Sequence, residues 1–248
     1  MPFIGDSHFE KDIILWGVRW YVAYPISYRQ LEEMLGERGV AVDHATLNRW
    51  VIKYSPEFEK QFRRRQRPVG QSWRMDETYV KIKGKWAYLY RAVDKEGHTI
   101  DFLLTPTRDQ DAAEAFLRKA IRHQQLPEKI TLDQSGANTA AIKHYNRTHK
   151  TAIAIRHAKY LNNLIEQDHR AVKRITRPRL GFKSFWAARC TIAGMEAMHA
   201  IRKGQLISMG NAPQTPAEQF SALAASIIWS DNSARLHLNF ATEPKVTK

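Results

Sequence analysis

The sequence predicts an α/β protein in which a mixed sheet is covered by helices on both faces and is preceded by an all-helical segment. From Trp73 the spacing of apolar residues along the sequence changes from that of a helix to that of a strand. Two turn signals then divide this region into three hairpin-linked strands. Helical and strand patterns then alternate along the chain. Such alternation is typical of crossovers that add parallel strands to a sheet.

The first third of the chain predicts three helices. Ser7 and Glu10 form a capping box for a helix from about residue 8 to residue 24, which Pro25 ends. A second capping box, Ser27 with Gln30, begins a helix that stops near residue 39. Asp43 can cap the third helix.

The second and third helices, with a short turn between them, have the outline of a helix-turn-helix. An ordinary three-helix bundle has the same spacing, and the basic outer face of the third helix favours DNA binding. The candidate DNA contacts on that face are His44, Asn48, Arg49 and Lys53. We assign residues 1–61 to this domain. The arginine-rich segment 62–71 follows as a basic linker, either exposed along a phosphate backbone or a plain connector.

Residues 72–204 carry the sheet. The predicted strands are 73–82, 85–93, 98–106, 129–133 and 151–155, and the first two are joined by the tight-turn pair Lys83-Gly84. The predicted helices are 109–123, 138–149, one through Glu166, and one from Ser184 to about residue 203. Residues 205–248 form a C-terminal part with one short helix opened by Thr215 and Glu218, then a loose tail.

The net charge of +14 points to a polyanionic partner. Residues 156–204 hold 11 Lys and Arg against 3 Asp and Glu, so more than half of the excess lies in this one segment. The single cysteine, Cys190, excludes an internal disulfide and a CxxC zinc site, and it suits a reducing cytoplasm. Neither a signal peptide nor a membrane-spanning run is predicted.

Three acids lie at unusual positions, either in a strand, where burying an unpaired carboxylate is unfavourable, or among basic residues. Asp76 lies inside the first strand, Asp133 ends the fourth, and Glu166 is the one glutamate of a basic helix. On that helix Asn162, Asn163, His169, Arg170 and Lys173 share the face of Glu166. Carboxylate oxygens are the ligands of Mg²⁺, and two such ions can promote phosphoryl transfer. Because the chain holds 25 acids, three of them alone are a weak signal, and a solvated helix face is the ordinary alternative.

Two of these acids, Asp76 and Glu166, lie in stretches that resemble the DDE transposases of bacterial insertion sequences, specifically the insertion-sequence-six family. The stretches are residues 28–54, 73–117 and 160–205, and they include the motifs MDETY and IEQDHR. Asp133 lies between the second and third stretches, in the motif TLDQSGAN, which looks like the sequence around the second acid of this family. The resemblance implies a ribonuclease-H-like catalytic domain, in which the first and fourth strands are neighbours. It also implies that Asp76, Asp133 and Glu166 are the catalytic acids and hold Mg²⁺ or Mn²⁺, as two ions, and that Lys173 contacts the DNA of the element end.

By the same resemblance the protein binds terminal inverted repeats, frees 3′-hydroxyls and joins them to target DNA, with copy-type movement that gives cointegrates. It would act as a dimer or larger assembly on DNA at the bacterial nucleoid. One rival is a catalytically inactive, transposase-derived repressor, and another is a nuclease of this fold that cannot join strands. Among other acids, Glu77 points to the opposite side of its strand, Asp168 to another side of its helix, and Asp94 belongs to a turn. His169 is expected to be solvated or to contact DNA.

Overall fold

The computed structural model describes residues 9–133, 136–207, 214–224 and 227. Its strands are β1 (Ser72–Ile82), β2 (Lys85–Asp94), β3 (Thr99–Thr105), β4 (Lys129–Leu132) and β5 (Ala154–His157). Its named helices are α1 (Lys11–Ala23), α2 (Tyr28–Gly36), α3 (His44–Arg63), α4 (Gln110–His123), α5 (Gly136–His149), α6 (Lys159–Thr176), the 3₁₀ turn η2 (Arg177–Arg179) and α7 (Phe185–Arg202). A further helix covers 216–224, where Thr215 and Glu218 form the predicted capping box. Among the described residues no helix is long and apolar enough to span a membrane.

The strands form one mixed sheet in the order β3-β2-β1-β4-β5. The three hairpin-linked strands pair antiparallel, whereas β4 and β5 join β1 in parallel. The predicted fold class is therefore confirmed. The first and fourth strands are neighbours, as the ribonuclease-H-like fold requires.

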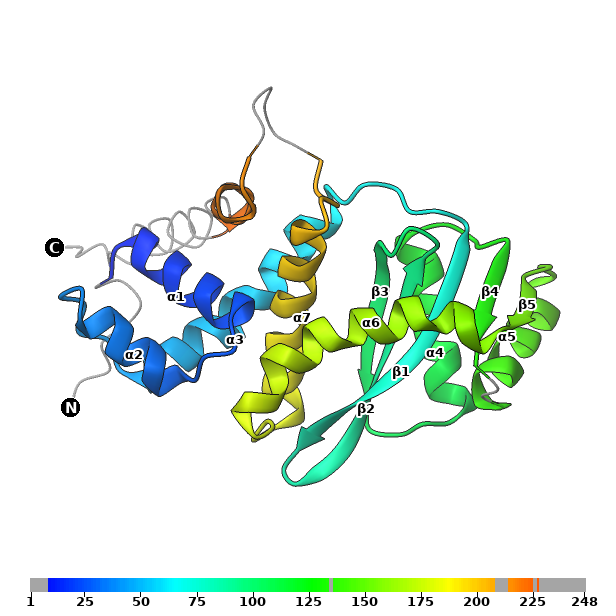
Figure 1. Ribbon diagram of the computed structural model, residues 1–248, viewed down its shortest axis with the longest axis horizontal. Helices are drawn as coiled ribbons and strands as arrows, with labels where there is room; N and C mark the ends of the chain where they lie inside the picture. Colours follow the sequence, from blue (N-terminus) through cyan, green and yellow to red (C-terminus); the bar gives the residue numbers. More distant parts are fainter. Residues whose placement is uncertain (1–8, 134–135, 208–213, 225–226, 228–248) are drawn as a thin grey trace, which may run out of the picture.

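Helices cover both faces of this sheet because successive side chains of a strand point to opposite sides. Trp73 and Met75 of β1 pack into a core with α4 and α5. Val80 and Ile82 belong to a different core, which α6 and α7 complete on the other face. Figure 1 shows α6 crossing the sheet on the side opposite α4.

The second and third helices begin where their capping signals predict, whereas the first does not. Ser27 and Gln30 form the capping box of α2, and Asp43 accepts hydrogen bonds from the first amides of α3. The first helix, however, begins at Lys11, three residues later than predicted, and its N-cap residue Glu10 makes no side-chain cap bond. Ser7, the other half of the predicted capping box, lies outside the described residues.

The core of the helical part does not end at its predicted boundary. Met195 and Met198 of α7, with Phe220 of the C-terminal helix, belong to the same buried cluster as Trp50 of α3. At the crossing of α7 with α3 and α1, an added Cβ at Gly194 would lie 2.7 Å from the Ser55 hydroxyl oxygen. The division of the chain at residue 61 stays a prediction about function, since the packing runs across it.

Two further segments differ from the sequence prediction. Helix α3 continues to Arg63, whose Nη2 donates to Asp101 and pairs with Glu59, each at 2.6 Å, so this arginine is not an exposed connector residue. Strand β5 begins at Ala154 and not at residue 151. The reason is local, because the side-chain oxygen of Asn146 accepts from the Thr151 hydroxyl and from the Ile153 amide.

Candidate active site

Asp76 lies in the middle of β1 and its side chain points towards α6. Its carboxylate is 17% exposed and one oxygen lies 3.2 Å from Nε2 of His169. The parallel pairing of β1 with β4 matches Arg74 with Thr131. Continuing this register by two residues brings Asp76 level with Asp133, which directly follows β4, so Asp76 stands beside the C-terminal end of the neighbouring parallel strand.

The polar face predicted for the helix α6 is divided in two. Glu166 and Arg170 are exposed and Lys173 is half-buried, as expected for groups that meet a ligand. Asn162 and His169, predicted to share that outward face, are instead 1% and 3% exposed. Both prediction errors have one cause: α6 packs on β1 over a wider stripe than its apolar residues mark. His169 finds a polar partner there in Asp76, whereas the amide of Asn162 has no hydrogen-bond partner among the described residues.

The buried guanidinium of Arg91 in β2 explains why a histidine can be enclosed there. It donates to both carboxylate oxygens of Glu196, at 2.7 and 2.8 Å, and pairs with Asp168 at 2.7 Å. Its Nη1 lies 3.3 Å from Nδ1 of His169. Because a guanidinium only donates, Nδ1 accepts, and the neutral ring donates its Nε2–H to Asp76. Arg91 thereby orients Asp76 through His169.

The pKa shifts of this cluster agree with that assignment. Burial lowers the pKa of His169, and the hydrogen bond to Asp76 opposes the shift only in part, so the ring is neutral near pH 7. Burial alone would raise the pKa of Asp168, but the charge of Arg91 and the hydrogen bond from His199 outweigh it and hold that pKa well below its usual range. The cluster is therefore a buried ion network with one neutral histidine at its edge.

Asp76 and Glu166 line the same groove between β1 and α6, a cavity of about 830 Å³. Arg170 and Lys173 line it too, so the two acids lie among cations. Asp133 is not part of this lining, and the three predicted ligands do not bring their oxygens within 4.8 Å of one another.

The described residues contain one group that meets that distance, Asp94, Glu96 and His98. The carboxylate of Asp94 accepts hydrogen bonds from the backbone amides of Glu96, His98 and Gly70. It is committed to holding the β2–β3 turn, in agreement with the prediction that Asp94 is a turn residue.

Glu77 points away from Asp76, as predicted. It pairs with Arg108 and accepts from Nδ2 of the buried Asn138 at 3.1 Å. Burial raises the pKa of Glu77, and the bonds from Asn138 and Arg108 offset this in part.

The four candidate DNA contacts of α3 lie in the N-terminal half of the helix. His44 is exposed and its Nδ1 lies 2.9 Å from a carboxylate oxygen of Glu32 in α2. Arg49 and Lys53 are exposed, and Asn48 is half-buried. Their role in binding DNA stays a prediction.

Comparison with known proteins decides the family. A family model described as a DDE domain matches residues 70–205, more than half of the chain and the whole span of the sheet. The chain belongs to the DDE transposases. A model of the transposase IS66 family also matches residues 13–125. As a DDE transposase the protein is a polynucleotidyl transferase.

Relatives place this transposase among those of insertion sequences. It is 39% identical over 228 residues to the transposase for insertion sequence-like element IS431mec of Staphylococcus aureus strain Mu50, covering 91% of this chain and all of the relative. The transposase for insertion sequence element IS257 in transposon Tn4003, also from Staphylococcus aureus, matches over the same shares with the same identity. The insertion-sequence-six family predicted from the sequence is thus confirmed.

Among solved structures, the HTLV-2 integrase catalytic core domain in complex with magnesium aligns with a TM-score of 0.43 and 16% identity, covering 60% of this chain and 95% of that one. The catalytic core domain of BIV integrase aligns with a TM-score of 0.42 and 15% identity, covering 64% and 99%.

Sequence reasoning missed Arg91 and the burial of His169. A signal for the first was present, because an arginine within the apolar strand KWAYLYRAV must find buried acids or leave the sheet. The acids that receive it lie 77 and 105 residues further along the chain, at Asp168 and Glu196.

Proposed function

We propose that this transposase binds the terminal inverted repeats of an insertion sequence and catalyses divalent-metal-dependent cleavage and transfer of DNA strands. Asp76, Asp133 and Glu166 are the proposed ligands of two Mg²⁺ or Mn²⁺ ions. The observation that supports the proposal is the β1–β4 register: continued by two residues, it brings Asp76 level with Asp133 at the C-terminal end of β4, and Glu166 lines the groove of Asp76. Hard oxygen donors of this kind fit Mg²⁺.

The chain's own groups have distinct tasks in this chemistry. The bound ions would activate the attacking oxygen and stabilise the leaving one. His169 fixes the orientation of Asp76, and Lys173 holds a phosphate of the scissile strand. In cleavage, water attacks the phosphorus and the bond to the 3′-oxygen breaks, which frees the 3′-hydroxyl. In transfer, that hydroxyl attacks a target phosphate and a target 3′-oxygen leaves.

Recognition of the ends is assigned to α3. His44, Asn48, Arg49 and Lys53 would read or hold DNA there, and Arg170 would contact backbone phosphates beside Lys173. Base contacts at the N-terminal end of such a helix give the specificity, whereas phosphate contacts position the complex. Two ends must be joined, so a dimer or larger assembly is required, acting by copy-type transposition to cointegrates at the nucleoid of the bacterial cytoplasm.

The test is incubation of the full-length protein with a labelled inverted-repeat duplex from its own element and a target plasmid, with Mg²⁺ or with EDTA. Nicked and joined products are expected only with the metal. Asp76→Asn, Asp133→Asn and Glu166→Gln should each reduce both products to background while retaining end binding in a gel-shift assay. Nicking by Asp133→Asn at the wild-type rate would remove that residue from the site.

The two rivals predict different patterns in the same assay. A repressor binds the ends and gives no nick under any metal condition. A nuclease gives nicked products and no joined ones. Either pattern with the wild-type protein would refute the proposed reaction.

A further inference from the structure

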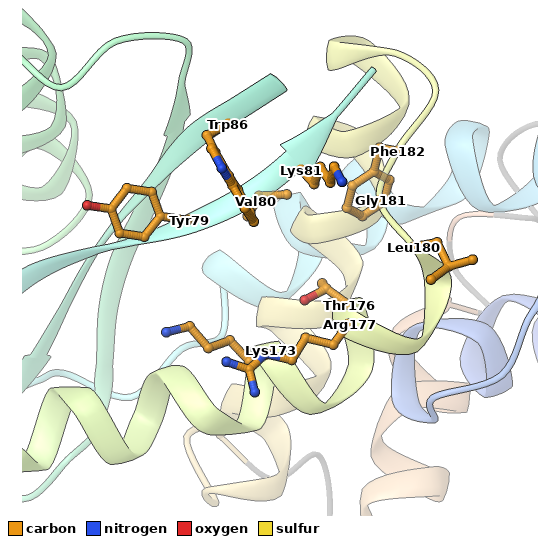
Figure 2. A pocket seen from close by; sticks show the side chains of 10 residues that line it. All are labelled: Tyr79, Val80, Lys81, Trp86, Lys173, Thr176, Arg177, Leu180, Gly181 and Phe182. Carbon is orange, nitrogen blue, oxygen red and sulfur yellow. The ribbon is translucent and has the colours of Figure 1, made fainter. Parts of the chain in front are cut away.

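A second cavity, of about 640 Å³, opens beside the groove of Asp76 and Glu166. It lies between the β1–β2 hairpin and the C-terminal end of α6. Figure 2 shows Tyr79 and Trp86 on the hairpin and Lys173 and Arg177 on the helical side of this cavity. Tyr79, Lys173 and Arg177 line both hollows, so the two are adjacent, and together they are called the channel below.

The hairpin exposes aromatic surface beside this cavity, from the face of β1 opposite to that of Asp76. Trp86 is 61% exposed and Tyr79 48% exposed, and their rings meet edge to face with centroids 6.1 Å apart. An aromatic ring that is about half exposed does not gain the stabilisation that full burial would give. An exposed pair of such rings beside a cavity therefore indicates a binding surface.

The charges of the cavity select its occupant. Its lining includes the cations Lys81, Lys173 and Arg177 and no acid. None of these three side chains has a carboxylate partner in the part of the chain that the structure describes. Cations that track a backbone, interleaved with aromatic rings, are the features that bind unpaired nucleic acid strands, because every base has a face on which a ring can stack. Paired bases inside a duplex present only their edges, and so cannot use these rings.

The backbone keeps this channel open. Strand β1 pairs with β4 only through residues 72–74, so beyond them no strand among the described residues covers its outer edge. The segment after η2 closes the far end, where the Phe182 amide donates to the carbonyl of Lys81 at 2.8 Å and Gly181 has φ +100. An added Cβ at Gly181 would lie 2.7 Å from that carbonyl oxygen, so this closure needs glycine.

We propose that this channel is a binding site for an unpaired DNA strand next to the scissile phosphate, with Trp86 and Tyr79 stacking on its bases. Lys81 and Arg177 hold the phosphates of that strand, and Lys173 leads it into the groove of Asp76 and Glu166. The site rests on the proposed function and adds to it a requirement for melted bases at the element end.

The probes that test it need no element sequence. Binding of the full-length protein to a single-stranded ten-nucleotide oligothymidylate is compared with binding to an abasic strand of the same length, in EDTA. Loss of base stacking weakens binding by roughly 5- to 150-fold per base, so the wild-type protein should prefer oligothymidylate by at least the lower figure.

Substitutions on the hairpin then assign that preference. Trp86→Ala should remove most of the preference for oligothymidylate over the abasic strand, and Trp86→Phe should retain most of this preference. The matched control is Trp186→Ala, because Trp186 is 60% exposed and also lies beside an arginine, but lines a different cavity. That control should keep the full preference. Lys81→Ala should weaken the binding of oligothymidylate and of the abasic strand equally. It should also lower the salt dependence of that binding by about one phosphate contact.

Two outcomes overturn the inference: equal binding of the two strands by the wild-type protein, or a full base preference in Trp86→Ala. Neither bears on cleavage, which the assay with metal and a labelled end measures separately. A protein that prefers bases through Trp86 but leaves its element ends intact keeps the strand site and loses the proposed reaction.

Discussion

Replacement of Gly194 by alanine tests how tightly the helical part is joined to the catalytic part. Gly194 lies in α7, and a Cβ there would stand 2.7 Å from Oγ of Ser55 and 2.8 Å from Cγ1 of Val22. Ordinary contact begins at 3.4 Å, so α7 and α3 must separate by about 0.7 Å, the difference between 3.4 and 2.7. Forcing an extra methyl into a packed core typically costs about 1–3 kcal/mol.

Helix propensity acts in the opposite direction, because alanine is favoured over glycine inside a helix by about 1 kcal/mol. Gly36→Ala supplies the control, since Gly36 is an exposed residue of α2 with nothing within 4 Å of an added Cβ. We expect Gly36→Ala to be neutral or stabilising and Gly194→Ala to lie about 1–3 kcal/mol below it in free energy of unfolding. Urea denaturation followed by far-UV circular dichroism measures both. For a chain of this size each kcal/mol also lowers the melting temperature by about 2–4 °C.

A second substitution identifies the contact. The Ser55 hydroxyl is buried and has no hydrogen-bond partner among the described residues, so Ser55→Ala alone should cost little. Combined with Gly194→Ala it removes the nearest clashing atom and should restore part of the lost stability. If Gly194→Ala is as stable as Gly36→Ala, the two helices are not packed as closely as the structure has them.

Two further substitutions test the candidate site. Lys173→Ala should lower single-turnover nicking at saturating protein on the order of 100-fold, because misplacing the scissile phosphate by ~1 Å has that effect. Lys143→Ala, an exposed lysine of α5, should leave the nicking rate unchanged; equal rates for the two variants would leave Lys173 only an electrostatic role. Arg91→Met should cost about 3–5 kcal/mol in urea denaturation, because Glu196 and Asp168 lose their buried partner. Arg118→Ala, which breaks a half-exposed pair with Glu114, should cost no more than about 1 kcal/mol, and similar losses for the two arginines would contradict the buried network.

Signals that act over a few residues were predicted correctly from the sequence. The pair Lys83-Gly84 has positive φ at both positions, 49° and 79°, as a two-residue hairpin turn requires. Ser27 and Asp43 cap the helices that they were predicted to cap. Asp76 and Glu166 line the same groove. The elements that carry them, a strand and a helix, could be predicted because the spacing of their apolar residues is clear.

The rest depends on contacts between distant parts of the chain. Helical periodicity marks Asn162 and His169 as polar, and only the docking of α6 on β1 shows that both are enclosed. The apolar strand around Arg91 indicates that this arginine needs a buried acid, but no local pattern indicates that its partners are Asp168 and Glu196, 77 and 105 residues further along the chain. The channel with the aromatic residues could not be predicted from the sequence for a similar reason. Tyr79 and Trp86 belong to strands, and Arg177 belongs to a turn that comes close to them only in the folded chain.

The core that α7 shares with α1 and α3 has a consequence for the length of DNA that the protein can process. Helices fused over common side chains leave no pivot between the part proposed to read the element end and the part proposed to cut it. Under the proposed function, the molecule would hold the recognised sequence and the scissile bond at a fixed separation. Each base pair inserted between the recognised sequence and the tip would move the scissile bond by about 3.4 Å along the duplex, well beyond the ~1 Å that catalysis tolerates. Elements moved by such a protein have to keep that spacing constant, whatever bases fill it.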